Sequence, residues 1–214
     1  MLFRSEKVSE NAAAFSDTFS MTVDVYEKVA QRIVLHEVFT SSTCAPCRLG
    51  NMLLDSVFAK NPNKFTCIKY QMSWPSPGDP YYTNEGGIRR TYYEVNSVPY
   101  LVADGDYYGG SPGSYTSSML QMEYIQASFI EFAATFVTDG DHSYSTNLTV
   151  TPLKTITGTH KLYVALVEKV THMNMKTNGE TSFYYVHKKF MTDASGQSIT
   201  LQADQDVVVD LNFK

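Results

Sequence analysis

Cysteines are few in this sequence, and long apolar segments are missing. Only 3 of the 214 residues are cysteines, which is too few for disulfides to hold together a scaffold of this length. No apolar run approaches the roughly 20 residues that a membrane-spanning helix needs. The first six residues, MLFRSE, lack the apolar stretch of a signal peptide. We therefore expect no transmembrane segment, and a lipid anchor on an N-terminus that has been removed is compatible with the sequence.

An excess of positive charge is also missing. Lys and Arg together number 17 and Asp and Glu number 22, which gives a net charge of −5. A mildly acidic chain without a basic block is a poor partner for nucleic acid. The sequence contains no Walker loop and no HExxH or GxSxG motif, so we expect no cofactor. Hydrophobic residues make up 43% of the chain, enough to bury the core of one large domain or two small ones.

The first half of the chain alternates between strand and helix patterns. Residues 33–39 are mostly apolar, as in a strand covered on both faces, and helical spacing of apolar residues follows Cys47. The expected elements after that helix are a strand at 65–72, a short helix capped by Asn84, a strand at 97–103, a hairpin strand at 106–108 and a helix at 115–128. The residues expected on the apolar helix faces are Leu49, Met52, Leu53 and Val57, then Ile88, Tyr92 and Val95.

The pattern changes near residue 128, because only strand-like segments follow. These segments are 129–138, 143–151, 161–170, 183–192 and 198–211. Short turn signals separate them, which is typical of an antiparallel, Ig-like β-sandwich. The predicted organisation is an N-terminal arm (1–28) with a possible strand at 19–25, an α/β domain (29–128) and a β-sandwich domain (129–214).

Cys44 and Cys47 are three positions apart at the expected start of a helix. Two thiols in this arrangement can close into a disulfide, and the helix N-terminus stabilises a thiolate there. We expect Cys44 to be the exposed, attacking sulfur and Cys47 to be the shielded sulfur that resolves a mixed disulfide. Cys67 lies in the middle of a strand, where a buried and inert thiol is expected.

Three other interpretations of the cysteine pair remain open. A permanent structural disulfide is the strongest of them. A zinc half-site is disfavoured, because structural zinc usually needs four ligands in close pairs. Copper binding by the pair needs a histidine that folds close to it. The further candidate ligands, none paired at ligand spacing, are Cys67, His36, His142, His160, His172 and His187; we therefore expect no metal.

The segment Phe39–Cys47 (FTSSTCAPC) and the later Val98-Pro99 pair give the chain a resemblance to thioredoxins. In that family the CxxC motif opens a helix, and a cis-proline lies across from it. The resemblance implies that Pro99 is cis and that Val98 contacts the substrate. Thr43 stands where thioredoxins carry a tryptophan.

One further departure concerns the buried acid of thioredoxins, which lies six residues before the first cysteine. Val38 occupies that position, and Glu37 is its neighbour. Because side chains alternate along a strand, Glu37 is expected on the opposite face of the sheet. We expect Glu37 to be a satisfied or solvated acid, so fast reductase activity is in doubt.

A closer resemblance is to a bacterial family of secreted or surface-anchored thioredoxin-like proteins, often described as small outer-membrane proteins. The residues that carry it are Tyr70–Pro75 (YQMSWP), Asp79–Tyr82 (DPYY), Asn84, Arg90–Val95 (RTYYEV), Val98-Pro99, Asp104-Gly105, Leu162–Glu168 (LYVALVE) and Tyr185–Met191 (YVHKKFM). Members join a thioredoxin-like domain to a β-sandwich. The resemblance implies an extracytoplasmic location, either periplasmic or at the cell surface.

The sequence therefore predicts a thiol–disulfide oxidoreductase that acts on protein thiols or disulfides. Cys44 and Cys47 are the expected catalytic residues, and Val98, Pro99 and Trp74 are the expected substrate contacts. Trp74 is expected to wall a groove beside the CxxC motif, although aromatic side chains in loops often only pack. The alternative is a non-enzymatic surface binding module in which the CxxC motif forms a structural disulfide.

Overall fold

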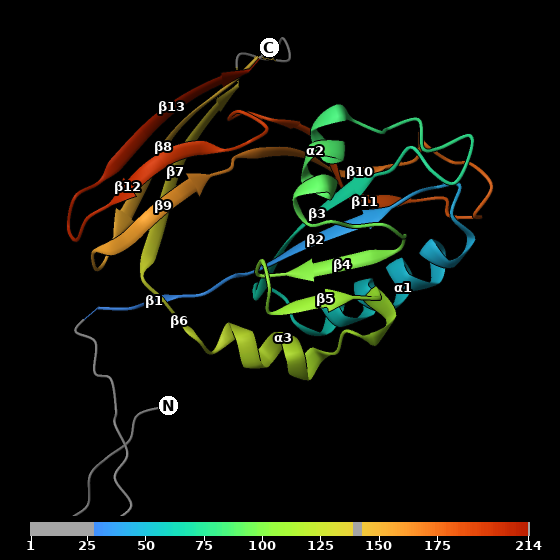
Figure 1. Cartoon of the computed structure of the whole chain (residues 1–214), viewed down its shortest axis with the longest axis horizontal. Coiled ribbons are helices and arrows are strands. Elements are labelled where there is room, and N and C mark those ends of the chain that lie inside the picture. Colours follow the sequence, from blue (N-terminus) through green and yellow to red (C-terminus); the bar gives the residue numbers. More distant parts are fainter. Residues whose placement is uncertain (1–27, 139–142, 214) are drawn as a thin grey trace, which may run out of the picture.

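A six-stranded sheet forms the centre of the molecule in the computed structural model, which describes residues 28–138 and 143–213 (Figure 1). The possible strand at 19–25 and nearly all of the expected N-terminal arm lie outside the described residues. The strand order in the sheet is β10-β11-β3-β2-β4-β5. Their bounds are β2 (Val34–Thr40), β3 (Phe65–Gln71), β4 (Tyr100–Ala103), β5 (Tyr108–Gly110), β10 (Ala165–Thr171) and β11 (Phe183–Phe190).

Helices cover both faces of this sheet (Figure 1). One face carries α1 (Ala45–Lys60) and α3 (Ser117–Tyr124), and the other carries α2 (Asn84–Tyr92). A short 3-10 helix, η1 (Pro112–Ser114), precedes α3. Alternation along β2 sends Val38 into the core beneath α1 and α3, and Phe39 into the separate core on the other face. The sheet is therefore buried on both sides, as the apolar run at its centre predicts.

The helices form where expected, but their buried faces differ from the prediction. On α1 the expected core residues Leu49, Met52 and Leu53 are 60%, 54% and 44% exposed. The helix instead buries a neighbouring stripe that includes Asn51 and Leu54. Helical periodicity allows both stripes, and the choice between them depends on what packs against the helix.

The same correction applies to α2. The side chain of Thr83, not that of Asn84, caps the helix by accepting a hydrogen bond from the Gly86 amide. Ile88 and Tyr92 are exposed, and Arg89 is buried instead. A charged side chain can lie on the buried face here because an acid on β2 meets it there, as described below.

The strands expected in the second half divide between two regions. β10 and β11 form an antiparallel hairpin that extends the central sheet, with β11 parallel to β3 at the Val186–Lys69 pair. Assigning these two strands to the β-sandwich was therefore wrong. Strand patterning identifies a strand but not the sheet edge that it joins. The residue ranges proposed for the domains stay a prediction.

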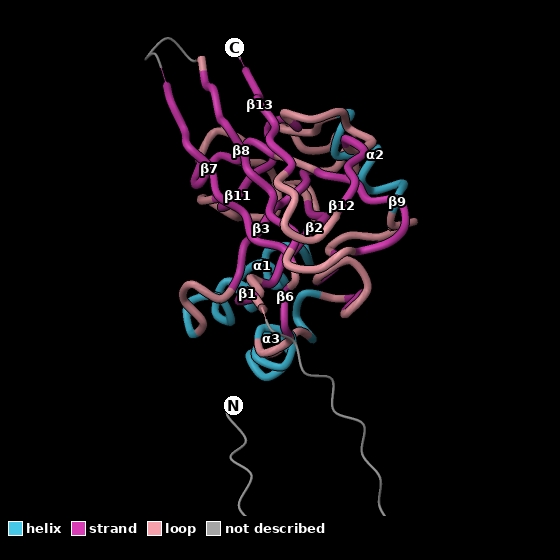
Figure 2. Tube along the Cα trace, turned by 90° about the vertical axis from the view of Figure 1, so that its left-hand side faces the viewer, coloured by secondary structure: helices cyan, strands magenta, loops and turns pink. Residues whose placement is uncertain are grey.

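The remaining strands form a smaller β region, which lies to the left of the central sheet in Figure 1 and in front of it in Figure 2. Their bounds are β7 (Ile130–Thr138), β8 (Tyr144–Pro152), β9 (Ile156–Leu162), β12 (Gln197–Leu201) and β13 (Val207–Phe213). One sheet has the order β13-β8-β7 and the other is the ribbon β12-β9. Leu148 and Val150 of the first sheet share a core with Leu162 and Leu201 of the ribbon. In coarse terms the chain therefore has an α/β part and a two-layered β part.

A short strand pair marks the junction of the two parts. β1 (Ala30–Gln31) pairs antiparallel with β6 (Ala127–Ser128). In the part of the chain that the structure describes, no helix has the length and apolar character to cross a membrane.

Candidate functional site

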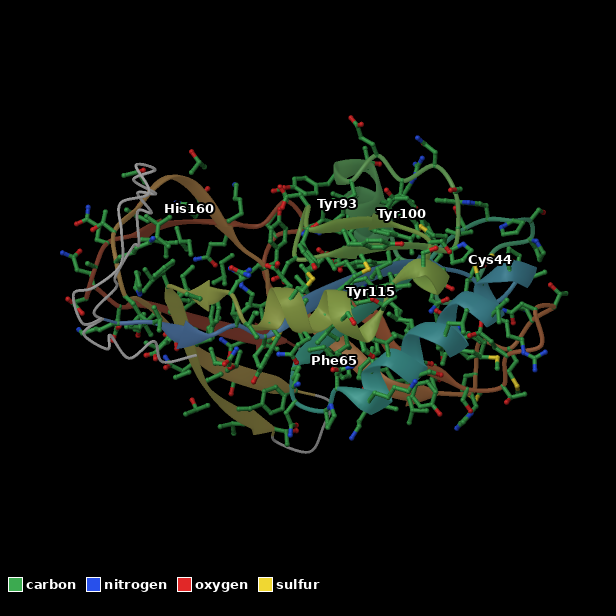
Figure 3. The ribbon with its side chains drawn as sticks, turned by 90° about the horizontal axis from the view of Figure 1, so that it is seen from below. Cys44, Phe65, Tyr93, Tyr100, Tyr115 and His160 are labelled. Carbon is green, nitrogen blue, oxygen red and sulfur yellow. A yellow bond between two sulfur atoms is a disulfide. The ribbon has the colours of Figure 1, made fainter. Side chains whose placement is uncertain are left out.

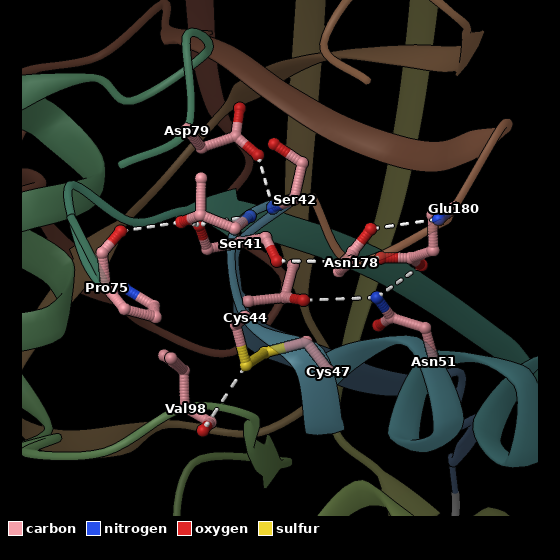
Figure 4. The surroundings of a disulfide bond; sticks show 12 residues. Ser41, Ser42, Cys44, Cys47, Asn51, Pro75, Asp79, Val98, Asn178 and Glu180 are labelled. Atoms are coloured by element: carbon pink, nitrogen blue, oxygen red, sulfur yellow. Dashed lines mark hydrogen bonds between the residues drawn. A yellow bond between two sulfur atoms is a disulfide. The ribbon is translucent and has the colours of Figure 1, made fainter. Parts of the chain in front are cut away.

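A disulfide joins Cys44 and Cys47 at the start of α1 (Figure 4). Cys44 is the N-cap residue, and Pro46 sits in the first turn, where a missing amide hydrogen costs nothing. The residues of that first turn, all of them described, include no acidic side chain. No carboxylate within the first turn therefore offsets the positive end of the helix dipole at the sulfurs. Figure 3 places Cys44 at the opposite end of the molecule from His160 in the β part.

Both sulfur-bearing residues are buried, Cys44 at 2% and Cys47 at 0% exposure. Our expectation that Cys44 is exposed was therefore wrong. The Sγ atom of Cys44 lies 3.6 Å from the carbonyl oxygen of Val98, whose backbone covers it from one side. The two residues between the cysteines, Ala45 and Pro46, are exposed.

Val98 and Pro99 lie beside the disulfide, as expected, and the peptide bond between them is cis. Two further cis bonds precede Pro75 and Pro77. Pro99 packs against the second turn of α1, where a β-carbon on Gly50 would lie 3.1 Å from Cγ of Pro99. A glycine at position 50 therefore permits the close approach of the helix to this segment.

The loop after β3 packs against the segment that leads into the disulfide. The hydroxyl of Thr43 donates to the carbonyl of Pro75 at 2.6 Å. The amide of Ser42 donates to Oδ2 of Asp79 at 2.7 Å (Figure 4). Asp79 also accepts a hydrogen bond from the Tyr81 amide. These bonds fix the backbone just before Cys44.

The loop between β10 and β11 closes the site from the other side, and sequence reasoning missed it. The amide of Asn178 donates to the Ser42 carbonyl at 2.9 Å, and its side chain donates to the Ser41 carbonyl at 3.2 Å. Glu180 accepts hydrogen bonds from Asn178 at 2.5 Å and from Asn51 on α1 at 2.8 Å (Figure 4). The sequence signal at this loop is the Asn178-Gly179 pair, which predicts a turn but not what the turn packs against.

Several buried polar atoms around the disulfide have no hydrogen-bond partner among residues 28–138 and 143–213. They are Ser42 Oγ, Asn51 Oδ1, Asn174 Oδ1 and both polar side-chain atoms of Gln71. Ordered water is the usual partner of such groups. Burial raises the pKa of the nearby Glu180 carboxyl, although the bonds from Asn51 and Asn178 counteract the rise. The inner side of the site therefore combines a carboxyl group whose pKa burial raises with polar atoms that have no described hydrogen-bond partner.

Glu37 points to the opposite face of the sheet, as strand alternation predicts. It is 2% exposed and forms two hydrogen bonds with Arg89, at 2.7 and 2.9 Å. The hydroxyls of Tyr70 and Tyr93 also donate to it. Burial and the charge of Glu37 raise the pKa of both tyrosines. Glu37 is a satisfied acid and does not contact the disulfide.

Trp74 is only partly exposed and packs on the core that lies beneath α2. The guanidinium of Arg90 lies 5.1 Å from its ring centroid. Trp74 also lines a cavity of about 430 Å³, together with Tyr82 and Ile88. Neither cysteine is among the residues that line this cavity. Substrate contact by Trp74 stays a prediction.

Among the described residues, the remaining cysteine and the histidines form no metal-ligand cluster with the disulfide. Burial raises the pKa of the Cys67 thiol to about 12, which fits the expected inert role. His36 lies in the core with Phe58 and Tyr115. Among the described residues, no group of three or more His, Cys, Asp or Glu side chains is placed to hold a metal ion. Nothing in the described residues therefore favours the copper interpretation.

No protein-family model and no curated protein matches the chain. Two solved structures share its fold with a TM-score of 0.61 and 14% sequence identity each. The match to protein AGR_C_4864 from Agrobacterium tumefaciens covers 85% of this chain and 79% of that one. The match to HBP35 of Porphyromonas gingivalis covers 86% of this chain and 64% of that one, so the chain spans less than two thirds of HBP35. At this identity the likeness is one of fold.

Proposed function

We propose that the protein is a thioredoxin-like thiol–disulfide oxidoreductase that acts on protein thiols or disulfides in an extracytoplasmic compartment. The observation that carries the proposal is the Cys44–Cys47 disulfide at a helix N-terminus without acidic side chains in its first turn. This environment favours a thiolate, which is both the attacking species and a good leaving group. A disulfide, and the lack of a membrane-spanning helix within the described ranges, are compatible with that location.

Exchange proceeds by two displacements at sulfur. In the reduced protein the Cys44 thiolate attacks a substrate disulfide, forms a mixed disulfide and releases the first substrate thiolate. Cys47 then loses its proton and attacks Cys44, so the second substrate thiolate leaves and the Cys44–Cys47 bond forms again. The substrate gains two electrons, and the reverse sequence oxidises a substrate dithiol. Val98 and Pro99 align the partner chain beside Cys44, and Trp74 supplies a further contact.

A second candidate follows from the burial of Cys44. Cys44 as a residue is 2% exposed, so its sulfur meets a protein substrate only if its surroundings open. A surface binding module with a structural disulfide needs no such opening.

A redox titration separates the two candidates. The reduction potential of the Cys44–Cys47 pair is measured against glutathione or dithiothreitol buffers. An exchange enzyme is expected to show a potential above about −300 mV, and a structural bridge one below it. A lower value would favour the binding module.

Trapping with a disulfide-bonded peptide tests the assigned roles. Cys47→Ser should accumulate a mixed disulfide with the peptide, because the resolving thiol is missing. Cys44→Ser should form none and lose turnover. The matched control is Cys67→Ala, which removes the buried thiol and should retain exchange. Normal turnover by Cys44→Ser would refute the mechanism.

A further inference from the structure

The cavity of about 430 Å³ beside Trp74 is a groove between α2 and the loop after β3. α2 contributes Gly87, Ile88 and Arg90 to its walls, and the loop contributes Trp74 and Tyr82. A β-carbon at position 87 would lie 2.5 Å from the hydroxyl oxygen of Tyr82, so the glycine lets the loop pack closely against the helix. Among the described residues of the lining, Arg90 is the only charged one, so the groove carries a positive charge.

Neutral groups hold Arg90 in place. Its guanidinium lies over the ring of Trp74, 5.1 Å from the centroid, and its Nε donates to the Val95 carbonyl at 2.7 Å. One Nη group lies 3.5 Å from the side-chain oxygen of Asn96. These contacts fix the side chain but neutralise none of its charge, and they use fewer N–H donors than a guanidinium has. Arg90 therefore presents a positioned positive charge with donors for a further partner.

The loop wall of the groove continues to the disulfide. Trp74 precedes Pro75, whose carbonyl accepts a hydrogen bond from Thr43, the residue before Cys44. Two peptide bonds and one hydrogen bond therefore connect Trp74 to Cys44, which corresponds to a distance on the order of 10–15 Å.

The helix wall leads to the same place. Arg90 binds the Val95 carbonyl, and the chain runs from there to Val98, whose carbonyl oxygen lies 3.6 Å from Sγ of Cys44. In Figure 4, Pro75 and Val98 both lie to the left of Cys44. A polypeptide whose cysteine meets Cys44 can therefore extend past these two segments into the groove.

We propose that the groove binds a carboxylate side chain of the protein substrate, so that segments with Asp or Glu near the reactive cysteine are preferred. The inference rests on the proposed oxidoreductase function. Arginine binds a carboxylate through paired N–H···O bonds, which are shorter and stronger than bonds between neutral groups. Ile88, which is 49% exposed, and the ring of Trp74 offer apolar contact to the aliphatic part of that side chain. An extended chain advances about 3.3 Å per residue, so the acidic residue should lie about three to five residues from the reactive cysteine.

Three disulfide-linked peptide dimers test the preference with the reduced full chain. They share one sequence and carry Asp, Asn or Lys four residues away on each side of the cysteine. The second-order rate constant for the Asp peptide should exceed that for the Lys peptide by about tenfold, with the Asn peptide between them, and added salt should shrink the ratio. Equal rates would overturn this inference and leave the oxidoreductase function standing, whereas no exchange with any peptide would overturn both.

Substitutions assign the preference to the guanidinium. Arg90→Gln should bring the ratio of the Asp rate to the Lys rate close to one, and Arg90→Lys, which keeps the charge, should retain part of it. The matched control is Lys60→Gln, which removes one positive charge at the exposed far end of α1 and should keep the full ratio. An unchanged ratio in Arg90→Gln would overturn the proposal. An equal loss of preference in Lys60→Gln would show that net charge selects the peptide, and would overturn it as well.

Discussion

Glu37, which is buried, and Glu180, which is half-buried, lie on opposite faces of the central sheet and have different partners. Glu37, on the α2 face, forms an ion pair with Arg89 and accepts two tyrosine hydroxyls. Glu180, beside the disulfide helix on the α1 face, accepts hydrogen bonds only from the neutral amides of Asn51 and Asn178 among its described partners. One carboxylate is fully compensated, and the other is not.

This difference in partners distinguishes a carboxylate with a structural role from a carboxyl group whose protonation can change. A buried charge that is paired and fully hydrogen-bonded holds a single arrangement, and removing either partner is costly. A buried carboxyl group with neutral donors can gain or lose a proton at a moderate cost. The resemblance to thioredoxins drew attention to the position next to Glu37, whereas the carboxyl group near the disulfide is that of Glu180, whose pKa burial raises.

The largest effect is expected at the Glu37 cluster. Arg89→Ala leaves Glu37 buried without its counter-charge and should lower the free energy of unfolding by about 3–5 kcal/mol. Urea denaturation followed by circular dichroism measures the change. As a control, Lys188→Ala removes a half-exposed ion pair with Glu168 and should cost about 1 kcal/mol or less.

The double variant Glu37→Gln, Arg89→Met separates loss of charge from loss of packing. It leaves no ion in the site, so it should be more stable than Arg89→Ala alone. If Arg89→Ala unfolds at the same urea concentration as the wild type, Glu37 is not compensated by Arg89 and the contrast with Glu180 is lost.

The local elements of both sites could be predicted from sequence. The apolar run at 33–39 corresponds to β2, and the disulfide forms at the helix start where Cys44 and Cys47 were expected. These features are determined by residues that are close together in the sequence, so hydrophobic periodicity and motif spacing are enough to predict them. The satisfied state of Glu37 was also expected, but Arg89 as its partner was not.

The second wall of the disulfide site could not be predicted. Asn178 and Glu180 reach it because the β10–β11 hairpin joins the edge of the central sheet. This pairing is a long-range contact, and the residue pattern of a strand does not specify which sheet edge the strand joins. The position of the β10–β11 hairpin also explains which face of α1 is buried. Asn51 is buried because Thr40 and Glu180 accept its amide hydrogens, and neither partner is visible in the helical pattern of residues 45–60.

The protonation of His187 depends on the charge of Glu37. Its expected effect on the free energy of unfolding is somewhat smaller than that of Arg89→Ala. Burial lowers the pKa of His187 to about 4, and the charge of Glu37 opposes this only in part. The groups that face its ring are Tyr70, Phe190, Thr83 and Glu85. The unfolded chain takes up a proton near pH 6.5 and the folded chain does not. Stability should therefore fall as the pH drops from about 6.5 to about 4, by up to about 3 kcal/mol.

The stability–pH slope measured by urea denaturation tests this. His187→Gln should flatten the slope between pH 6.5 and 4. In the Arg89→Ala background the pKa of His187 should rise, because the Glu37 charge is no longer neutralised. An unchanged slope in His187→Gln would show that His187 takes up its proton equally in both states.

The smallest effect is expected at Glu180, and it has the opposite sign. Because burial raises its folded pKa above the unfolded value, the folded protein binds the proton more tightly than the unfolded chain does. The contribution of Glu180 to stability therefore becomes less favourable as the pH rises from the unfolded pKa of about 4.5 through the folded pKa. Glu180→Gln cannot ionise, so the stability of the wild type relative to this variant should decrease across that interval. A difference between wild type and Glu180→Gln that grows in the wild type's favour with rising pH would mean that Asn51 and Asn178 hold the carboxylate as firmly as Arg89 holds Glu37.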